Sequence, residues 1–114
     1  MRMKSLSLTK KERILKRSDF ININRHGRRI RTQNFTLIEQ PNGGDITRLG
    51  ITVSKKVGNS VKRNRLKRLI REFFRNHKHQ IPTGYDIVII PLQTIEEPDF
   101  SAICEELSNA LVQE

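Results

Sequence analysis

The residues that could do chemistry in this sequence are cations, and they are concentrated in residues 54–75. Nine residues of this segment are Lys or Arg and only Glu72 opposes them, a net of +8, whereas the rest of the chain has 13 basic and 11 acidic residues. Clustered guanidinium and ammonium groups do not break bonds; they neutralise phosphates and release counterions from a polyanion. The segment therefore predicts binding to nucleic acid or to an anionic membrane surface.

The same segment has the periodicity of an amphipathic helix, with apolar residues at i, i+3, i+4, i+7 and i+8. Gly58, Asn59 and Ser60 offer a flexible approach and candidate N-caps, so we expect the helix to begin near Val61, with free N–H groups that favour anions. One face should pack and the other should meet a polyanion; the alternative is an ordinary solvated surface helix. The apolar stripe is Leu66, Leu69, Ile70, Phe73 and Phe74, and the opposite side is Asn64, Arg65, Arg68, Arg71 and Arg75.

Residues 55–72, KKVGNSVKRNRLKRLIRE, resemble the signature of the bacterial ribonuclease P protein component, whose helix carries an Arg-Asn-Arg element. The similarity extends to Arg13, Asp19-Phe20, Gly27 and residues 48–53, and it covers most of residues 12–75. The resemblance implies an RNA-binding subunit of the ribonucleoprotein that removes the 5′ leader from precursor tRNA, with the catalytic RNA and precursor tRNA as partners. It also implies that the chemistry belongs to that RNA and to Mg²⁺ ions held mainly by the RNA and the substrate.

The resemblance assigns two sets of site residues. In the second set, Phe20 is expected in a cleft that receives single-stranded RNA, although an ordinary core position is the alternative. Asn24 and Ile38 occupy positions where family members often have further aromatics, so we expect weaker stacking here. The RNA-binding set is Lys55, Lys56, Lys62, Arg63, Asn64, Arg65, Lys67, Arg68 and Arg71. The leader-binding cleft is Arg13, Lys16 and Phe20.

Within the first set, Arg63, Asn64 and Arg65 form the centre of the motif. Asn64 cannot supply charge, so we expect it to hydrogen-bond to backbone or to a base and to order the neighbouring guanidinium groups. We assign no catalytic residue and no metal ligand to this chain. His77 and His79 lie poorly on one helical face at their i, i+2 spacing, so we expect them to end the helix.

Length and composition predict one RNA-binding domain over residues 1–114 with a modest core. The pI near 10.5 fits a nucleic-acid partner, and no apolar run approaches a membrane span. Cys104 is the single cysteine, which gives no internal disulfide and no thiolate zinc cluster. We therefore expect a cytoplasmic protein with no membrane association and no evident obligate protein partner.

The remaining patterns predict an α+β fold. Residues 10–16 suggest a helical turn or two, followed by a short helix capped by Ser18 that ends before Gly27. Strands are expected at residues 35–40, 48–54 and 85–90, and residues 28–32 suggest a short exposed strand or an arm. The strands at 35–40 and 48–54 should form a hairpin across the turn at 41–45, and the continuous apolar run at 85–90 should be the central buried strand. The final helix, after the acids at 96–99, should bury Phe100, Ile103, Cys104, Leu107 and Leu111.

The expected order is αβββαβα, a two-layer mixed four-stranded sheet with helices. A long helix between the strands at 48–54 and 85–90 suggests a parallel βαβ unit. Such crossovers are right-handed in about 98% of cases, but the resemblance implies the rare left-handed form that certain ribosomal protein domains share. The acidic C-terminal end has no Lys or Arg after Lys78, unlike the basic tail expected in the family, and should face away from nucleic acid.

Two other classes of function remain open on the residues alone. A ribosomal or other structural RNA- or DNA-binding protein could use the same basic helix, although no second helix adjoins it across a short turn as helix-turn-helix would require. A protein-only nuclease would need clustered carboxylates to hold metal ions, and the basic region lacks them. Glu72, the one acid of that region, is expected to pair with Arg68 or Arg75.

Overall fold

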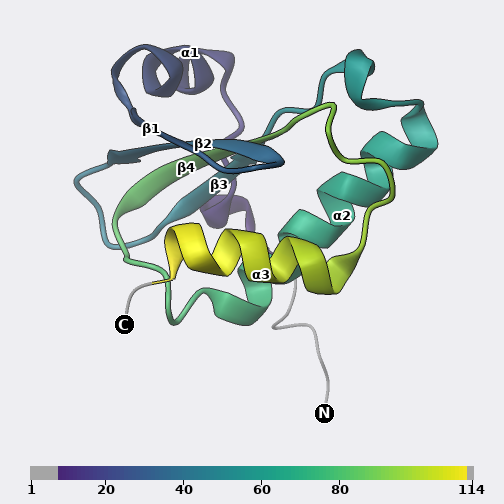
Figure 1. Cartoon of the computed structure of the whole chain (residues 1–114). Coiled ribbons are helices and arrows are strands. Elements are labelled where there is room, and N and C mark those ends of the chain that lie inside the picture. The colour runs from purple at the N-terminus through teal and green to yellow at the C-terminus, as the bar shows by residue number, and fades with distance from the viewer. Residues whose placement is uncertain (1–7, 113–114) are drawn as a thin grey trace.

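The computed structural model describes residues 8–112 and builds them around one sheet (Figure 1). Short 3-10 turns at Lys10–Glu12 and Lys55–Val57 precede the first and second helices. This is the αβββαβα order that the sequence predicts. The elements are α1 (Arg17–His26), β1 (Arg28–Arg31), β2 (Phe35–Pro41), β3 (Arg48–Ile51), α2 (Ser60–His77), β4 (Tyr85–Pro91) and α3 (Phe100–Leu111).

The sheet has the order β1-β2-β4-β3, so β4 lies at its centre. β4 pairs antiparallel with β2 and parallel with β3. The predicted hairpin between the second and third strands is therefore wrong: β1 and β2 form the hairpin, and β4 separates β2 from β3. Ile87, Val88 and Ile89 are all buried, so both faces of β4 are covered, as is typical of a strand inside a sheet and not at its edge.

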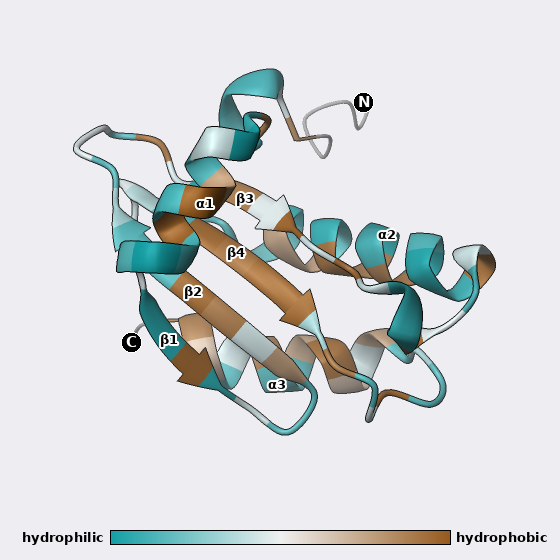
Figure 2. Cartoon of the chain, turned by 90° about the horizontal axis from the view of Figure 1, so that it is seen from above, coloured by the Kyte–Doolittle hydropathy of each residue, from teal (hydrophilic) through white to brown (hydrophobic). Residues whose placement is uncertain are grey.

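The connection from β3 through α2 to β4 is left-handed, as the resemblance implied. In Figure 2 the sheet is seen from the α1 side, β3 and β4 run in the same direction, and α2 lies behind them. Viewed instead from the α2 side with both strands pointing upward, β4 lies to the left of β3. Figure 2 shows the basic helix on the β3 side of the sheet.

The helices pack on both faces of the sheet and form two hydrophobic cores of unequal size. α2 and α3 lie side by side on one face, and α1 covers part of the other (Figure 1). The stripe predicted for residues 54–75 is buried against the first face, and Ile103, Leu107 and Leu111 of α3 pack into the same core. A smaller cluster joins α1 to the second face. Its buried members are Ile14, Ile23, Ile38 and Val88.

Side-chain hydrogen bonds cap the N-termini of α2 and α3, whereas the cap predicted for α1 does not form. The Asn59 side chain accepts from the backbone N–H of Lys62 and caps α2, and Asp99 caps α3 by accepting from the backbone N–H of Ala102. Ser18 does not cap α1, because the helix already begins at Arg17 and Lys16 occupies the N-cap position. Within residues 8–112, no helix is both long and apolar enough to cross a bilayer.

Candidate nucleic-acid interface

The cationic face of α2 exists because the opposite face is anchored. Leu66, Ile70 and Phe73 are fully buried, which fixes the rotation of the helix about its axis. Positions half a turn away must then point to solvent, and Arg65, Arg68 and Arg71 are exposed together with Asn64. We call these four residues the α2 cationic face. Lys55 and Lys56 are exposed on the 3-10 turn that leads into the helix.

Three of the predicted RNA-binding residues also bond to the chain itself. The Lys62 ammonium group donates to the carbonyl of Ile95, and the Arg63 Nε donates to the carbonyl of Gly58 at 3.2 Å. Arg65 reaches the carbonyl of Pro98 at 3.5 Å, the outer limit of a hydrogen bond. Lys62 therefore holds the loop before α3 against the first turns of α2, and less of its charge is available to a ligand than at Arg68 or Arg71.

The structure brings both predicted sets together beside β3. Arg13 and Phe20 from the N-terminal region line one hollow with Lys67 and Arg71 of α2. Leu49, Gly50 and Ile51 of β3 also line it. The Arg13 backbone forms an isolated parallel bridge with Leu49, so the N-terminal segment extends the β3 edge and holds Arg13 there. Lys16 is exposed but does not line this hollow.

Phe20 also borders a second, less charged hollow. Its side chain is half-buried and, with the exposed Leu15, separates the cationic hollow from the second one. Ile21 is 45% exposed, and Thr52 supplies a hydroxyl group at the same place. Sequence reasoning missed Leu15 and Ile21; the available signal was two apolar residues out of phase with the buried Ile14 and Ile23. The second hollow is lined by Leu15, Arg17, Phe20, Ile21, Asn24 and Thr52.

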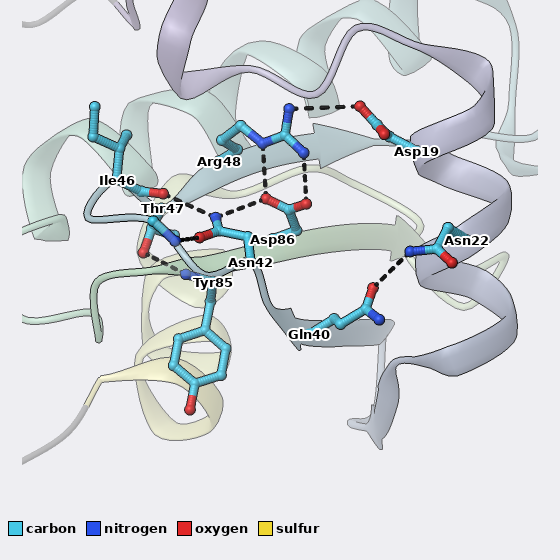
Figure 3. Close-up of polar contacts among 10 residues, drawn as sticks. Asp19, Asn22, Gln40, Asn42, Ile46, Thr47, Arg48, Tyr85 and Asp86 are labelled. Carbon is cyan, nitrogen blue, oxygen red and sulfur yellow. Dashed lines mark hydrogen bonds and ion pairs between the residues drawn. The ribbon is translucent and has the colours of Figure 1, made fainter.

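A partly buried ion-pair network sets the position of α1 (Figure 3). Arg48 donates to both carboxylate oxygens of Asp86, from Nε at 2.8 Å and from Nη2 at 2.6 Å, and its Nη1 lies 3.5 Å from Asp19. Asn42 donates a further hydrogen bond to Asp86 at 3.0 Å. Because Asp19 directly precedes Phe20, this network ties the start of α1 to β3 and β4 and fixes the ring above the sheet.

The network also perturbs the ionisation of its members. Burial alone would raise the pKa of Asp86, but the hydrogen bonds from Arg48 and Asn42 outweigh it, and the pKa lies below its ordinary value. The hydrogen bond to Asp86 raises the pKa of Arg48 above its already high ordinary value. Asp86 is thus a charged structural acid at neutral pH. It belongs to β4, whose other residues form an apolar run in the sequence.

Glu72 does not form the predicted ion pair. Among the described residues, it lies within salt-bridge distance of neither Arg68 nor Arg75. It lies instead near Cys104 of α3, where burial and the Glu72 charge together raise the pKa of the thiol. The reason is that Glu72 is on the flank of α2 that faces α3, so the α2 cationic face keeps its positive charge uncompensated.

The two histidines end α2, and only one of them is ordered by packing. His77 is the last residue of the helix, stacks on Phe73 with ring centroids 4.5 Å apart, and places Nδ1 at 2.9 Å from the Phe73 carbonyl. His79 is exposed beyond the helix end. Across residues 8–112, no three His, Cys, Asp or Glu side chains gather as a metal site would require.

Fold and site together define an α+β protein that presents a cationic helix beside a hollow edged by an aromatic ring, an arrangement that fits single-stranded nucleic acid. The Ribonuclease P family model matches residues 8–113, and the chain belongs to that family. It is 47% identical over 112 residues to the ribonuclease P protein component of Syntrophus aciditrophicus, covering 98% of this chain and 94% of the relative. The corresponding protein of Thermotoga maritima is 41% identical, with 92% and 93% covered.

Solved structures agree with the sequence relatives. The ribonuclease P protein of Thermotoga maritima superposes with a TM-score of 0.82 at 41% identity, covering 88% of this chain and 94% of that one. A mutant of the Staphylococcus aureus ribonuclease P protein, described as defective in mRNA degradation activity, gives 0.82 at 39% identity, with 88% and 85% covered. These relatives favour the ribonuclease P assignment, and none of them supports the alternative of a ribosomal protein.

Proposed function

We propose that this chain, a protein component of the tRNA-processing ribonucleoprotein ribonuclease P, binds two RNAs through two adjacent surfaces. The α2 cationic face and the 3-10 turn with Lys55 and Lys56 bind the ribonuclease P RNA. The hollows on either side of Phe20 receive the single-stranded 5′ leader of precursor tRNA. We also propose that the protein acts in the cytoplasm.

The observation that carries this proposal is the shared wall between the two hollows. Phe20 borders a cationic hollow with Arg13, Lys67 and Arg71 on one side and, on the other, a less charged hollow lined by Thr52 and a single arginine. A nucleotide has the same two parts, an anionic phosphate and a flat base that stacks on aromatic rings. The leader backbone would follow the cations while a base lies against Phe20, and Lys67 and Arg71 would connect this track to the α2 cationic face.

We assign bond breaking to the catalytic RNA and Mg²⁺ binding mainly to that RNA and the substrate. The buried Asp86 and the half-buried Glu106 are committed to structure: Asp86 is bonded to Arg48, and Glu106 accepts from Thr32 and Asn34. The two RNAs repel each other, and a compact cationic protein offsets that repulsion as added magnesium would. The chain thus supplies counter-charge and position, while magnesium bound to the RNAs would supply the Lewis acid of the reaction.

A binding experiment on the complex with ribonuclease P RNA tests the leader surface. Phe20→Leu keeps an apolar side chain over Gly50 but removes the ring, so precursor tRNA should bind more weakly by roughly 1–3 kcal/mol, the range for aromatic–base stacking. Mature tRNA, which has no leader, should bind unchanged. Phe100→Leu on α3 makes the same substitution at another half-buried Phe and should affect neither ligand. Equal losses for precursor and mature tRNA would contradict the proposal.

A further inference from the structure

The arginines of β1 form a second cationic surface that the basic helix does not explain. β1 is the edge strand farthest from β3, and Arg28, Arg29 and Arg31 are all exposed. Side chains alternate along a strand, so Arg29 and Arg31 share one face and Arg28 lies on the other. Arg29 is paired with Ile38 and Arg31 with Thr36, which places both arginines on the face that α1 covers in part.

A single row of residues connects these arginines to the leader cleft. Arg31 pairs with Thr36 of β2, Thr36 pairs with Ile90 of β4, and the register of β3 and β4 continues to bring Thr52 beside Ile90. The Thr52 N–H donates to the Ile89 carbonyl at 3.1 Å, which confirms that alignment. Three strand intervals of about 4.8 Å make the row about 14 Å long. It starts at Thr52, in the hollow beside Phe20.

The row lies on the part of the sheet that α1 leaves uncovered. Figure 2 shows α1 over one end of the strands, with the last residues of β4 and the first of β2 open beside it. Thr36 and Ile90 are half-buried and Thr52 is exposed, so a ligand can touch all three. The floor is flat and uncharged between the cations of the cleft and those of β1. A single strand of nucleic acid can therefore lie across this part of the sheet, because no acidic side chain in the row repels its phosphates.

The two arginines differ in how they are held. Arg29 donates to the side-chain oxygen of Asn24 at 2.7 Å, which orients its guanidinium group and leaves other donors free. Arg31 has no acidic partner within ion-pair distance in residues 8–112, whereas Arg28, on the opposite face, pairs with Glu39 at 3.4 Å. The face with the row therefore carries uncompensated charge, and the other face of the same strand does not.

We propose that Arg29 and Arg31 bind phosphates of the precursor's leader after it leaves the cleft at Phe20 and crosses the sheet along the row from Thr52 to Arg31. This inference rests on the proposed function, because it extends the same leader path. Charge complementarity and continuity with the cleft both favour the leader over a structured RNA. The competing explanation is that the β1 arginines only prevent edge-to-edge pairing of sheets.

Leader length separates these possibilities. The experiment uses the complex of this protein with ribonuclease P RNA. We would measure its affinity for two precursors, with leaders of about two and about ten nucleotides; the longer leader is within the span of a single-strand-binding domain. With both Arg29→Gln and Arg31→Gln, affinity for the long leader should fall about tenfold, and the salt slope should flatten by roughly 0.7 for each phosphate that is no longer neutralised. The short-leader precursor should change less than about twofold.

Arg28→Gln is the matched control, because it removes the same charge from the same strand on the opposite face. It should leave both precursors unchanged. An equal loss for short leaders, for mature tRNA or for the ribonuclease P RNA alone would show that β1 contacts structured RNA and would overturn the inference. Unchanged affinity in the double variant would also overturn the inference, whether or not that variant self-associates. The β1 arginines would then serve only to prevent edge-to-edge pairing of sheets. If the unaltered protein did not distinguish precursor from mature tRNA, the leader cleft itself would be contradicted.

Discussion

The ring of Phe20 occupies the space above Gly50 that a side chain would fill. A Cβ atom built on Gly50 would lie 2.7 Å from the Cε1 atom of Phe20 and 2.8 Å from Cζ. Contacts this short do not occur between unstrained carbons, so glycine at this position of β3 allows α1 to bring its aromatic ring down onto the sheet. The small residue belongs to the strand and the ring to the helix, yet together they form the floor and wall of the leader cleft.

Gly50→Ala should therefore displace Phe20 and weaken leader binding without altering any charge. We expect a loss of roughly 1–3 kcal/mol in stability, the usual cost of overpacking, and a weaker affinity for precursor but not for mature tRNA. Adding Phe20→Leu should recover part of the stability, because the shorter side chain relieves the clash. Denaturant unfolding of both single variants and the double variant measures this coupling. Strict additivity of the two changes would contradict the contact.

The α2 cationic face should dominate the salt dependence of RNA binding. Changing Arg65 and Arg68 to Ala should flatten the slope of log K against log salt for ribonuclease P RNA by roughly 0.7–0.9 for each phosphate left without its cation. Lys62→Ala should flatten it less, because the Lys62 ammonium group already bonds to the Ile95 carbonyl. The measurement is the slope of log K against log salt for both variants, taken over a range of potassium concentrations. An unchanged slope in the Arg65 and Arg68 variant would remove this face from the interface.

The ion pair between Arg48 and Asp86 should stabilise the fold only while Asp86 is charged. Its pKa is below the ordinary value of 3.8, so its contribution is complete above that pH and is lost as the pH falls through the folded-state pKa. Asp86→Asn should cost about 1.5–3 kcal/mol at neutral pH, the worth of hydrogen bonds to charged groups. The difference from the unaltered protein should shrink below about pH 3.8. A difference that stayed constant down to about pH 2 would contradict this explanation.

Glu106 should be structural although it lies on the acidic C-terminal helix. Its carboxylate accepts from the backbone N–H of Asn34 at 2.6 Å and from the Asn34 side chain at 2.9 Å, which fastens α3 to the β1–β2 turn. Glu106→Ala should lower the free energy of unfolding by about 1.5–3 kcal/mol. Glu105→Ala removes the same charge at an exposed neighbouring position and should have no such effect. Thermal denaturation of the two variants tests this, and equal melting temperatures would contradict the tether.

Local sequence patterns predicted the helices and strands, whereas the pairing of the strands depends on non-local contacts that these patterns do not show. The helix at α2 was predictable because its apolar spacing and the Asn59 cap are both local. The pairing of β2 with β4 was not, because the turn between β2 and β3 suggests a hairpin, and which strands pair depends on contacts between segments distant in the sequence.

The candidate site shows the same division. Arg13, Phe20 and the cations of α2 were named from the family resemblance, and the structure brings Arg13 and Phe20 beside Lys67 and Arg71. The partner of Arg48 was not foreseen, since Asp86 is 38 residues away. Its signal was an acid inside an apolar strand, which requires a buried partner.

If this chain contributes charge and position while the catalytic RNA performs the bond breaking, protein and magnesium should be partly interchangeable. Ribonuclease P RNA should then cleave precursor tRNA at a lower magnesium concentration when the protein is present. The variant with Arg65→Ala and Arg68→Ala should need more magnesium for the same rate, because fewer cations offset the repulsion between the two RNAs.

The most direct measurement is the single-turnover cleavage rate as a function of magnesium, with saturating protein, for the unaltered chain, this variant and the protein without RNA. We predict no cleavage by the protein alone, and curves for the two complexes that are shifted along the magnesium axis but reach similar plateaus. Cleavage by the RNA-free protein, or a plateau that stays far lower for the variant at saturating magnesium, would contradict this division of labour and place part of the chemical step on this chain.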